Sequence, residues 1–315
     1  MRGVGHGGVS ELQRARILTA MIEAVAERGT ANVTVAHVVG RCGVSRRTFY
    51  ETFAGCEACF IAAFDRVVEQ LTGRVQSAVA QEDAWRDRMR ASLNALLEYI
   101  EDEPSAGRLV IVEALGAGPA VLQRRQAIVD RAVAAVDRGR EESKRGEGPP
   151  RLTAEGTVGA VLAVVHARIA AGRQPSLIEL LNPLMSMIVH PYLGPAAARK
   201  ELNRPKPKLR RRAVSRSGNP FGGLEMRVTY RTVRVVMTIG SHPGVSNRRV
   251  AEEAGVLDQG QISKLLARLD RVGLIENRGV GLARGGSNSW YLTERGREVE
   301  VAIREQTDRE QASRG

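Results

Sequence analysis

Apolar residues recur at helical spacing through most of this chain, and this pattern constrains the fold more than any other feature. Between residues 73 and 193, no useful stretch alternates with the period of two that a half-buried strand shows. Breaks that contain Gly or Pro divide this segment into helices, at Pro104, 116–119, 146–150 and 172–175. The sequence therefore predicts an all-helical domain over residues 73–193.

Shorter helices are predicted before that domain, between residues 13 and 72. The first ends at Gly29, Thr34 caps the second, Ser45 caps the third, and a fourth follows directly. The Gly-rich residues 1–12 should be disordered.

Positive charge is concentrated at one end of the chain. The 315 residues carry a net charge of +12, and residues 194–315 account for +11 of it. Residues 194–222 hold nine Arg or Lys against one Glu, together with several Pro, and this composition cannot build a core. We expect a basic flexible linker there and a polyanionic partner for this end of the chain.

A second globular pattern, residues 223–304, follows the linker. It predicts three helices, two short strands at 274–277 and 289–292, and a final helix. The polar residues 305–315 are expected to form a tail.

The composition is typical of a soluble globular protein, with 43% hydrophobic and 26% charged residues. No apolar run reaches the length of a membrane span, and the N-terminus lacks a charged head followed by an apolar stretch. Three cysteines cannot form a disulfide framework, which fits a reducing compartment. We expect a cytoplasmic protein with no membrane contact.

Cys56 and Cys59 form a C-x-x-C pair that has two interpretations. They form a thiol switch or half of a metal site, or they are two small apolar residues one helical turn apart. A zinc site needs further ligands, and the chain has no second C-x-x-C and no H-x-x-x-H motif. We therefore predict no metal and no cofactor.

Residues 34–53 predict two short helices joined by a tight turn. Phe49 and Phe53 lie one helical turn apart and face inward. The opposite face of the second helix is polar, and such a helix fits the major groove of B-DNA. The candidate DNA contacts are Thr34, Ser45, Arg46, Arg47, Thr48, Tyr50 and Thr52. An ordinary helical hairpin with a solvated face is the alternative.

The pattern T-V-x-x-V-x-x-x-x-G-V-S-x-x-T-F-Y-x-x-F in this segment resembles the DNA-binding domain of the TetR family of repressors. The similar stretch runs from about Arg14 to Leu71. The resemblance implies that residues 34–42 position a recognition helix at residues 45–53. It also implies a helical middle domain that binds an effector and dimerises through its last two helices. Family members often have Lys at the start of the fourth helix to hold a phosphate, where this chain has Cys56.

A second candidate contact surface lies near the C-terminus. The third helix of that region has an inward apolar stripe made of Ile262, Leu265, Leu266 and Leu269. The outward candidates for DNA contact are Gln259, Gln261, Lys264 and Arg268, with Arg278 and Arg284 on the Gly-rich hairpin. The motifs S-N-R-R-V-A-E-E-A-G-V, Q-I-S-K-L-L-A-R-L-D-R-V-G-L-I and W-Y-L-T-E-R-G-R-E-V resemble a winged helix of the MarR type. A small basic domain that binds a protein partner is the alternative.

Residues 153–171 are almost wholly apolar and residues 177–193 are apolar too. Two such helices need burial on more than one side, which predicts a homodimer that forms through residues 153–193. A pocket in the middle domain would be mainly aliphatic and would accept a small apolar ligand. Its candidate lining residues, for which a place in the core is the more common role, are Trp85, Tyr99, Met185 and Met187. His166 and His190 are expected in the core.

These features together predict a mainly α protein, with TetR-like helical N-terminal and middle domains followed by a winged helix-turn-helix. We expect a homodimeric, nucleoid-associated repressor that binds double-stranded DNA and is released by a small apolar effector. Linker residues Arg210, Arg211 and Arg212 either contact phosphates or form a solvated spacer. An architectural protein that bridges two DNA segments without an effector is the alternative. The sequence lacks the common catalytic motifs, so no enzymatic activity is expected.

Overall fold

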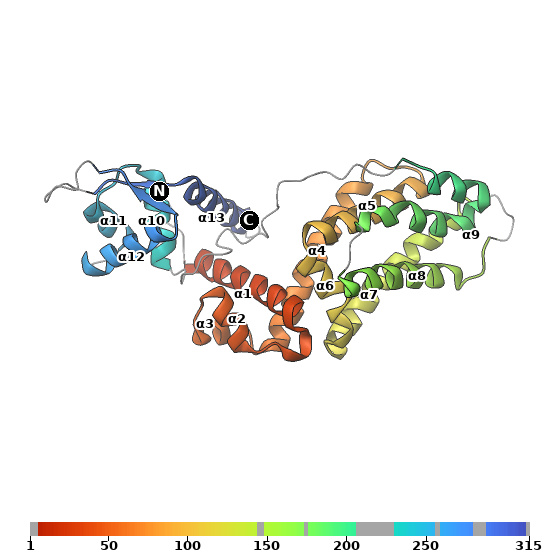
Figure 1. The fold of residues 1–315 in the computed structure, drawn as a ribbon, viewed down its shortest axis with the longest axis horizontal. Helices are drawn as coiled ribbons and strands as arrows, with labels where there is room; N and C mark the ends of the chain where they lie inside the picture. Colours follow the sequence, from red (N-terminus) through yellow and green to blue (C-terminus); the bar gives the residue numbers. More distant parts are fainter. Residues whose placement is uncertain are drawn as a thin grey trace. The chain divides into compact units, whose positions relative to one another are not determined.

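A computed structural model describes residues 6–143, 148–172, 176–205, 230–255, 259–279 and 288–312 (Figure 1). Contacts within the chain divide it into two units. The first unit comprises Met1–Ala20, Val35–Phe53 and Arg216–Gly315, and the second comprises Met21–Thr34 and Ala54–Ser215. The described residues are mainly helical with one two-stranded sheet, which confirms the predicted fold class.

The N-terminal elements are α1 (His6–Arg28), η1 (Thr30–Asn32), α2 (Val35–Cys42) and α3 (Arg46–Thr52). As predicted, α2 begins directly after Thr34 and Ser45 caps α3. The expected disorder of residues 1–12 is wrong for residues 6–12, which form the first turns of α1. A long helix propagates into poor helix formers such as Gly, because each added residue contributes a hydrogen bond without a new nucleation step.

The helical body of the second unit follows. Its elements are α4 (Cys56–Val79), α5 (Trp85–Asp102), α6 (Pro104–Ile111), η2 (Glu113–Gly116), α7 (Pro119–Asp137), η3 (Arg138–Arg140), α8 (Thr153–Ala171), η4 (Leu177–Leu180) and α9 (Leu181–Leu202). The predicted breaks agree with these boundaries. Pro104 and Pro119 are the first residues of their helices, and Gly172 ends α8 in the left-handed conformation.

The core of this body joins α5, α8 and α9. Trp85, Leu97, Val165 and Tyr192 are all buried within it. The rings of Trp85 and Tyr192 lie 5.2 Å apart, and the indole Nε1 of Trp85 donates a hydrogen bond to the carbonyl oxygen of Ala135 at 2.9 Å. The indole thus fills apolar space while its one donor is satisfied, as a buried Trp requires.

The residues after Gly194 in α9 are helical, whereas the sequence predicted a flexible linker there. Gly194, at φ 81°, breaks the helix, and a further helical stretch then runs to Leu202. Ala198 and Glu201 on this stretch are buried. The expectation of a flexible linker from residue 194 is therefore wrong for its first part, while residues 206–229 lie outside the described structure.

An ionic cluster around Glu201 explains why this basic stretch packs on the body. Glu201 is fully buried, with Arg90 at 2.7 Å, Arg204 at 3.4 Å and Arg86 at 3.6 Å. Asn182 accepts from Arg90 at 2.5 Å and donates to the carbonyl oxygen of Arg204 at 2.6 Å. Glu201, the one acidic residue of the predicted linker, thus forms ion pairs with arginines of α5 and holds this stretch on the body.

The C-terminal domain contains α10 (Tyr230–Ser241), α11 (Asn247–Ala254), α12 (Gln259–Arg271), β1 (Ile275–Asn277), β2 (Trp290–Leu292) and α13 (Glu294–Ala312). The two strands are antiparallel, with Glu276 opposite Tyr291. This order of helices and hairpin agrees with the predicted one. The predicted tail from residue 305 is wrong as far as Ala312, because α13 continues to that residue.

One buried core holds the C-terminal domain together, and Val236, Leu266 and Trp290 belong to it. Gly296 allows α13 to start against the strand, because any side chain there would collide with the carbonyl oxygen of Leu274.

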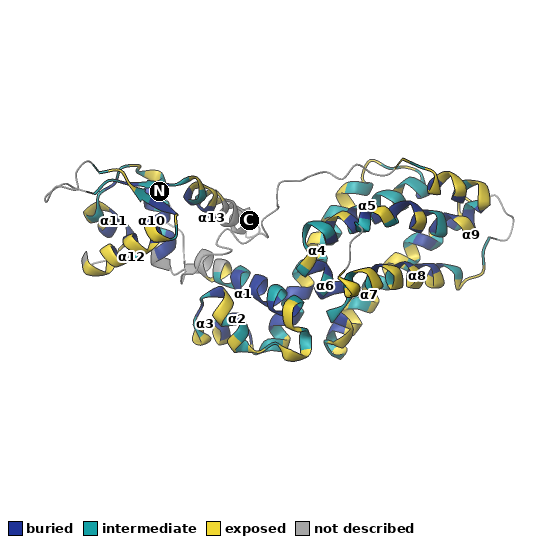
Figure 2. Cartoon of the chain, in the orientation of Figure 1, coloured by how far each residue is buried: buried dark blue, intermediate teal, exposed yellow. Residues whose placement is uncertain are grey.

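Helix α8 is unusually apolar for its exposure (Figure 2). Only 28% of its most apolar 18-residue window is buried, and the mean hydropathy of this window is 1.3. By length and composition only, this helix of 19 residues could cross a membrane. The expectation that no run has the length of a membrane span is therefore wrong on length and composition alone. One such helix is weak evidence for a span, since core helices of soluble proteins pass the same test.

We predict that Glu201→Ala destabilises the helical body by about 3–5 kcal/mol, because Arg90 would lose its buried counter-ion while Arg86 and Arg204 would keep only Asp87. Urea unfolding followed by Trp85 fluorescence measures this free energy in a Trp290→Phe background, since the chain has two Trp. The exposed Glu98→Ala serves as the control and should change it by less than about 0.5 kcal/mol. Equal unfolding curves for the two variants would contradict a stabilising role for the cluster.

Candidate nucleic-acid interface

The N-terminus of α3 is fixed by its cap. The backbone N–H of Thr48 donates to Ser45 Oγ at 3.0 Å, and the two hydroxyls of these residues lie 2.8 Å apart. Gly43, at φ 65°, forms the turn between α2 and α3 in a conformation that favours glycine. Cap and turn together set the direction in which α3 leaves the turn.

Aromatic packing holds the inner face of α3. Phe49 and Phe53 are buried, as predicted, and their ring centroids lie 5.9 Å apart. The guanidinium of Arg14 on α1 stands over the Phe53 ring at 4.8 Å. Val44, in the turn, is buried as well. A polar helix face is thus supported from beneath by apolar contacts.

The outer face of α3 carries Arg46, Arg47 and Tyr50, all exposed. Tyr50 is 58% exposed, and its ring lies at a right angle to the buried Phe49 ring, with 5.5 Å between the two centroids. Arg47 is bound by Glu51 at 2.8 Å, and this hydrogen bond raises the pKa of Arg47. Arg46 has no ion pair within the described part of the chain, so its guanidinium is available to a ligand.

The remaining candidates of this surface differ among themselves. Thr34 is exposed before α2. Thr48 and Thr52 are half-buried, and the hydroxyl of Thr52 donates to the carbonyl oxygen of Thr48 at 2.8 Å. The hydroxyl of Thr48 is likewise engaged with Ser45. The hydroxyls of these two threonines therefore already make hydrogen bonds within the helix and its cap.

The C-terminal domain presents a second polar helix face, on α12. Gln261, Lys264 and Arg268 are exposed, while Ile262 and Leu266 are buried beneath them. The predicted stripe also includes Leu269, which is buried, and Leu265, which is half-buried. The side chain of Gln259 and the whole of Arg284 lie outside the described residues.

Two arginines that the sequence reasoning missed lie on α11. Arg248 and Arg249 are exposed and pair with Glu252 and Glu253, each at 3.0 Å. The i, i+4 spacing of Arg and Glu in S-N-R-R-V-A-E-E was the signal for these pairs. The pairing leaves α11 with less net charge than α12.

The hairpin is braced at its base. Asn247 on α11 accepts hydrogen bonds from the indole Nε1 of Trp290 at 2.5 Å and from Asn288 at 3.2 Å. Arg278 pairs with Glu276 at 2.5 Å, and its guanidinium lies 5.0 Å from the centre of the Tyr291 ring. Arg278 is therefore exposed but already engaged.

Comparison with known proteins shows that the first of these two surfaces lies in a segment that matches a known family. The family model described as bacterial regulatory proteins of the tetR family matches residues 17–63, which include α2, α3 and the start of α4. The chain carries a TetR-family helix-turn-helix domain. The matched segment contains every residue that positions α3 except Arg14.

Relatives of known role are similar to part of this chain. The transcriptional activator FasR of Mycolicibacterium smegmatis is 28% identical over 98 residues, which cover 31% of this chain and 45% of FasR. The nucleoid occlusion factor SlmA of Haemophilus influenzae is 27% identical over 116 residues, covering 36% of this chain and 53% of SlmA. The chain thus spans about half the length of the curated relatives that it matches.

A solved structure shares the helical fold beyond the TetR-family domain. The fatty acid degradation regulator FadR of Bacillus halodurans superposes with a TM-score of 0.51 at 14% identity. The superposition covers 59% of this chain and 96% of FadR. The superposed part of this chain therefore shares the helical fold of FadR.

The three cysteines, Cys42, Cys56 and Cys59, lie within the segment that matches the tetR family and form no disulfide. Cys59 is buried and Cys56 is half-buried, and burial raises the pKa of the Cys56 thiol. Within the described residues, no group of three or more His, Cys, Asp or Glu is placed to hold a metal.

The predicted effector-pocket residues lie in or beside the core of the body. Trp85, Tyr99 and Met185 are buried, and Met187 is half-buried against the same core. They line neither a 380 Å³ cavity at the start of α4 nor a 910 Å³ groove between α7 and α8. Their role as ligand contacts stays a prediction.

The two histidines differ from the expected core positions. His166 is half-buried and His190 is exposed. His190 was expected inside because α9 is apolar in sequence, yet it falls on the solvent side of a helix whose other face fills the core.

We predict an unusual titration for Tyr99, whose hydroxyl donates to Gln70 Oε1 at 3.1 Å. Burial, with the nearby carboxylate of Glu103, raises its pKa to about 12 against the lowering effect of Arg74. The stability that this buried phenol contributes should be complete below pH 10 and be lost between pH 10 and about 12. The difference in absorbance at 295 nm between wild type and Tyr99→Phe measures this pKa, and a value near 10 in the folded protein would refute the assignment.

Proposed function

We propose that this protein is a homodimeric, sequence-specific DNA-binding repressor of transcription, working in the cytoplasm on the nucleoid. The observation that carries the proposal is the outer face of α3 in the TetR-family domain. Two arginines and an exposed tyrosine stand there on a helix anchored by buried phenylalanines. A helix with one rigidly held apolar face and one polar face is suited to the major groove.

The three exposed side chains of α3 have different tasks in this proposal. Arg46, which has no ion pair within the described residues, reads a guanine through its two parallel donors. Arg47 is partly neutralised by Glu51 and contributes to phosphate attraction. Tyr50 presents a ring edge to a thymine methyl and a hydroxyl to a phosphate.

We propose that the C-terminal domain is a winged helix of the MarR type that adds a second DNA contact. Gln261, Lys264 and Arg268 on α12 are exposed above a buried apolar stripe, in the arrangement seen on α3. Residues 194–315 also carry nearly all the net charge. Tethering this domain to the first one raises its effective concentration near DNA. The linker arginines 210–212 extend the same proposal but lie outside the described structure.

We propose that the dimer forms through α8 together with α9. The exposed face of α8 is built from small residues at helical spacing, at Gly156, Ala160, Ala163 and Ala167. Val164 beside them is 37% exposed. Small residues let two helices approach closely, and a second copy would remove this apolar surface from water.

A small apolar effector completes the proposed regulator. Aliphatic residues dominate the core of the body, and the similar FadR of Bacillus halodurans is a regulator of fatty acid degradation. Binding of the effector would favour a body conformation with lower DNA affinity, by its differential affinity for the two states.

Bridging of two DNA segments is the second candidate function. The observation that favours it is the presence of two separate polar recognition helices, α3 and α12, in one chain. One relative is a nucleoid occlusion factor. Loop formation on DNA with two sites, measured by tethered-particle motion, would favour this function, and footprints without loops would favour the single-site regulator.

We predict that Arg46→Ala and Tyr50→Ala each weaken binding to a duplex selected with the wild-type protein by about five- to a hundredfold, because each removes a contact to a base or its backbone. Arg47→Ala should have a smaller effect, since Glu51 already holds this side chain. Fluorescence anisotropy measures the affinities, and Arg88→Ala in the helical body is the matched exposed control.

In the same assay, Lys264→Ala with Arg268→Ala should reduce the slope of log affinity against log salt, because these cations release counter-ions from DNA. A variant that combines these two changes with Arg46→Ala and Tyr50→Ala but binds as wild type would overturn the proposed DNA interface. An effect of the α3 changes alone would restrict DNA binding to the TetR-family domain.

We predict that Ala163→Glu on α8 converts a dimer into a monomer, since two carboxylates would be buried without partners in the interface. Light scattering at micromolar concentration should give twice the chain mass of 34.2 kDa for wild type and the single mass for the variant. Ala80→Glu, at the exposed end of α4, is the control and should remain dimeric. A monomeric wild type would refute dimerisation through α8.

A further inference from the structure

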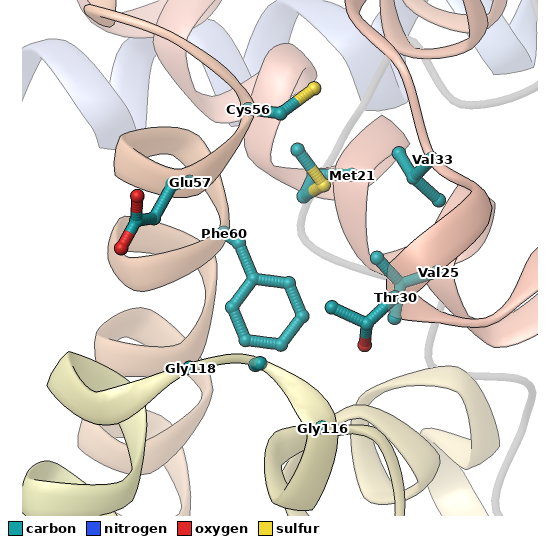
Figure 3. A pocket seen from close by; sticks show the side chains of 10 residues that line it. Met21, Val25, Thr30, Val33, Cys56, Glu57, Phe60, Gly116 and Gly118 are labelled. Carbon is teal, nitrogen blue, oxygen red and sulfur yellow. The ribbon is translucent and has the colours of Figure 1, made fainter.

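A cavity of about 380 Å³ lies within the second unit, at the start of α4 (Figure 3). Its walls come from the end of α1, from η1 and the residue after it, from the first turns of α4, and from the glycine-rich loop before α7. Met21, Val25, Val33 and Phe60 provide apolar wall, and Figure 3 shows the Phe60 ring facing the side chains of α1 and Thr30. This volume lies within the usual range of small-molecule sites.

The position of the cavity along the chain is its most informative property. The chain passes between the two units at residues 20–21, 34–35, 53–54 and 215–216. Met21, Val33 and Cys56 line the cavity, and each lies within three residues of one of the first three crossings. A molecule in the cavity would therefore touch residues close to the crossing that leads into α2 and to the crossing that leads out of α3.

Hydrogen bonds join two walls of the cavity to each other. The backbone N–H of Thr30 donates to Glu113 Oε2 at 3.0 Å, and the Thr30 hydroxyl donates to the Glu113 carbonyl oxygen at 3.2 Å. Arg108 binds the other carboxylate oxygen of Glu113 at 3.2 Å. These hydrogen bonds hold η1 against η2. The two walls are therefore fixed in place without a ligand.

The chemistry of the walls selects the ligand. Apolar side chains and three glycine-loop residues, 116–118, make up most of the lining. Burial raises the pKa of Cys56, so its thiol is protonated and neutral at physiological pH. Glu57, which is exposed, is the one charged residue of the lining and disfavours anions. The thiol and the carboxylate together suit an apolar molecule that is neutral or carries an amine.

We propose that this cavity is an effector site for a small apolar molecule, neutral or bearing one amine, and that its occupancy alters DNA binding by α3. This inference rests on the proposed DNA-binding function. It places the effector near the crossings of the chain instead of among Trp85 and Met185, which belong to the core of the body.

The three cysteines allow a direct test, because Cys42 and Cys59 are buried and Cys56 is half-buried. Benzyl methanethiosulfonate at pH 8.5 attaches a benzylthio group to Cys56 and fills the cavity, whereas the methyl reagent adds little volume. Mass spectrometry verifies single labelling. We expect the benzyl adduct to change the affinity for the selected duplex at least threefold, and the methyl adduct to change it less.

The fluorophore 1-aminoanthracene, an apolar amine, tests ligand binding itself. Its fluorescence should rise on binding to wild type, and the benzyl adduct should bind it at least tenfold more weakly. Saturating fluorophore should shift DNA affinity in the same direction as the benzyl group. The matched control is Cys56→Ala with Ala80→Cys, which carries the benzyl group at the exposed end of the same helix. Benzyl labelling of this variant should leave its own affinities for the fluorophore and for the duplex unchanged.

The outcomes separate the two proposals. Unlabelled protein that binds no duplex refutes the DNA-binding function, and the fluorophore measurement still tests the cavity. Protein that binds DNA with the same affinity, within threefold, before and after benzyl labelling refutes the regulatory role of the cavity. Absent fluorophore binding, or equal binding by wild type and benzyl adduct, refutes the ligand site. Circular dichroism distinguishes these results from unfolding.

Discussion

The burial of Phe49 and Phe53 is the interaction on which the proposed function depends. A helix of seven residues such as α3 is unstable in water by itself, because too few hydrogen bonds repay its nucleation. The two rings, with Arg14 over one of them, provide that free energy through tertiary contacts. The exposed side chains of α3 contribute little to stability, so its outer face is free to be specified by recognition.

Local signals explain what could be predicted from the sequence. Pro104, Pro119 and Gly172 fix helix ends through backbone geometry that neighbouring residues cannot override, and the structure agrees at each. Glu201 shows the opposite case. Composition around it indicates a solvated linker, but its partners Arg86 and Arg90 are more than a hundred residues away in the chain. No local pattern contains such a contact.

In the candidate site, too, local patterns predict some features and not others. Periodicity was sufficient to place Phe49 inside and Tyr50 outside, because both follow from one helix. It could not distinguish Arg46 from Arg47, whose difference arises from the ion pair with Glu51. The cavity beside Cys56 could not be foreseen either, since its walls come from separate segments that only the fold brings together.

Small energies suffice for control from such a cavity. A ligand moves an equilibrium between conformations only by the difference in its affinity for them, and a tenfold difference corresponds to about 1.4 kcal/mol. The contacts of one small apolar molecule with Met21, Val33 and Phe60 are of that size when a few apolar groups are buried in one conformation and not the other. The core of the body is close-packed around Trp85 and Tyr192, and opening it would cost several times more. Ligand control at the chain crossings therefore needs less rearrangement than ligand control through the core.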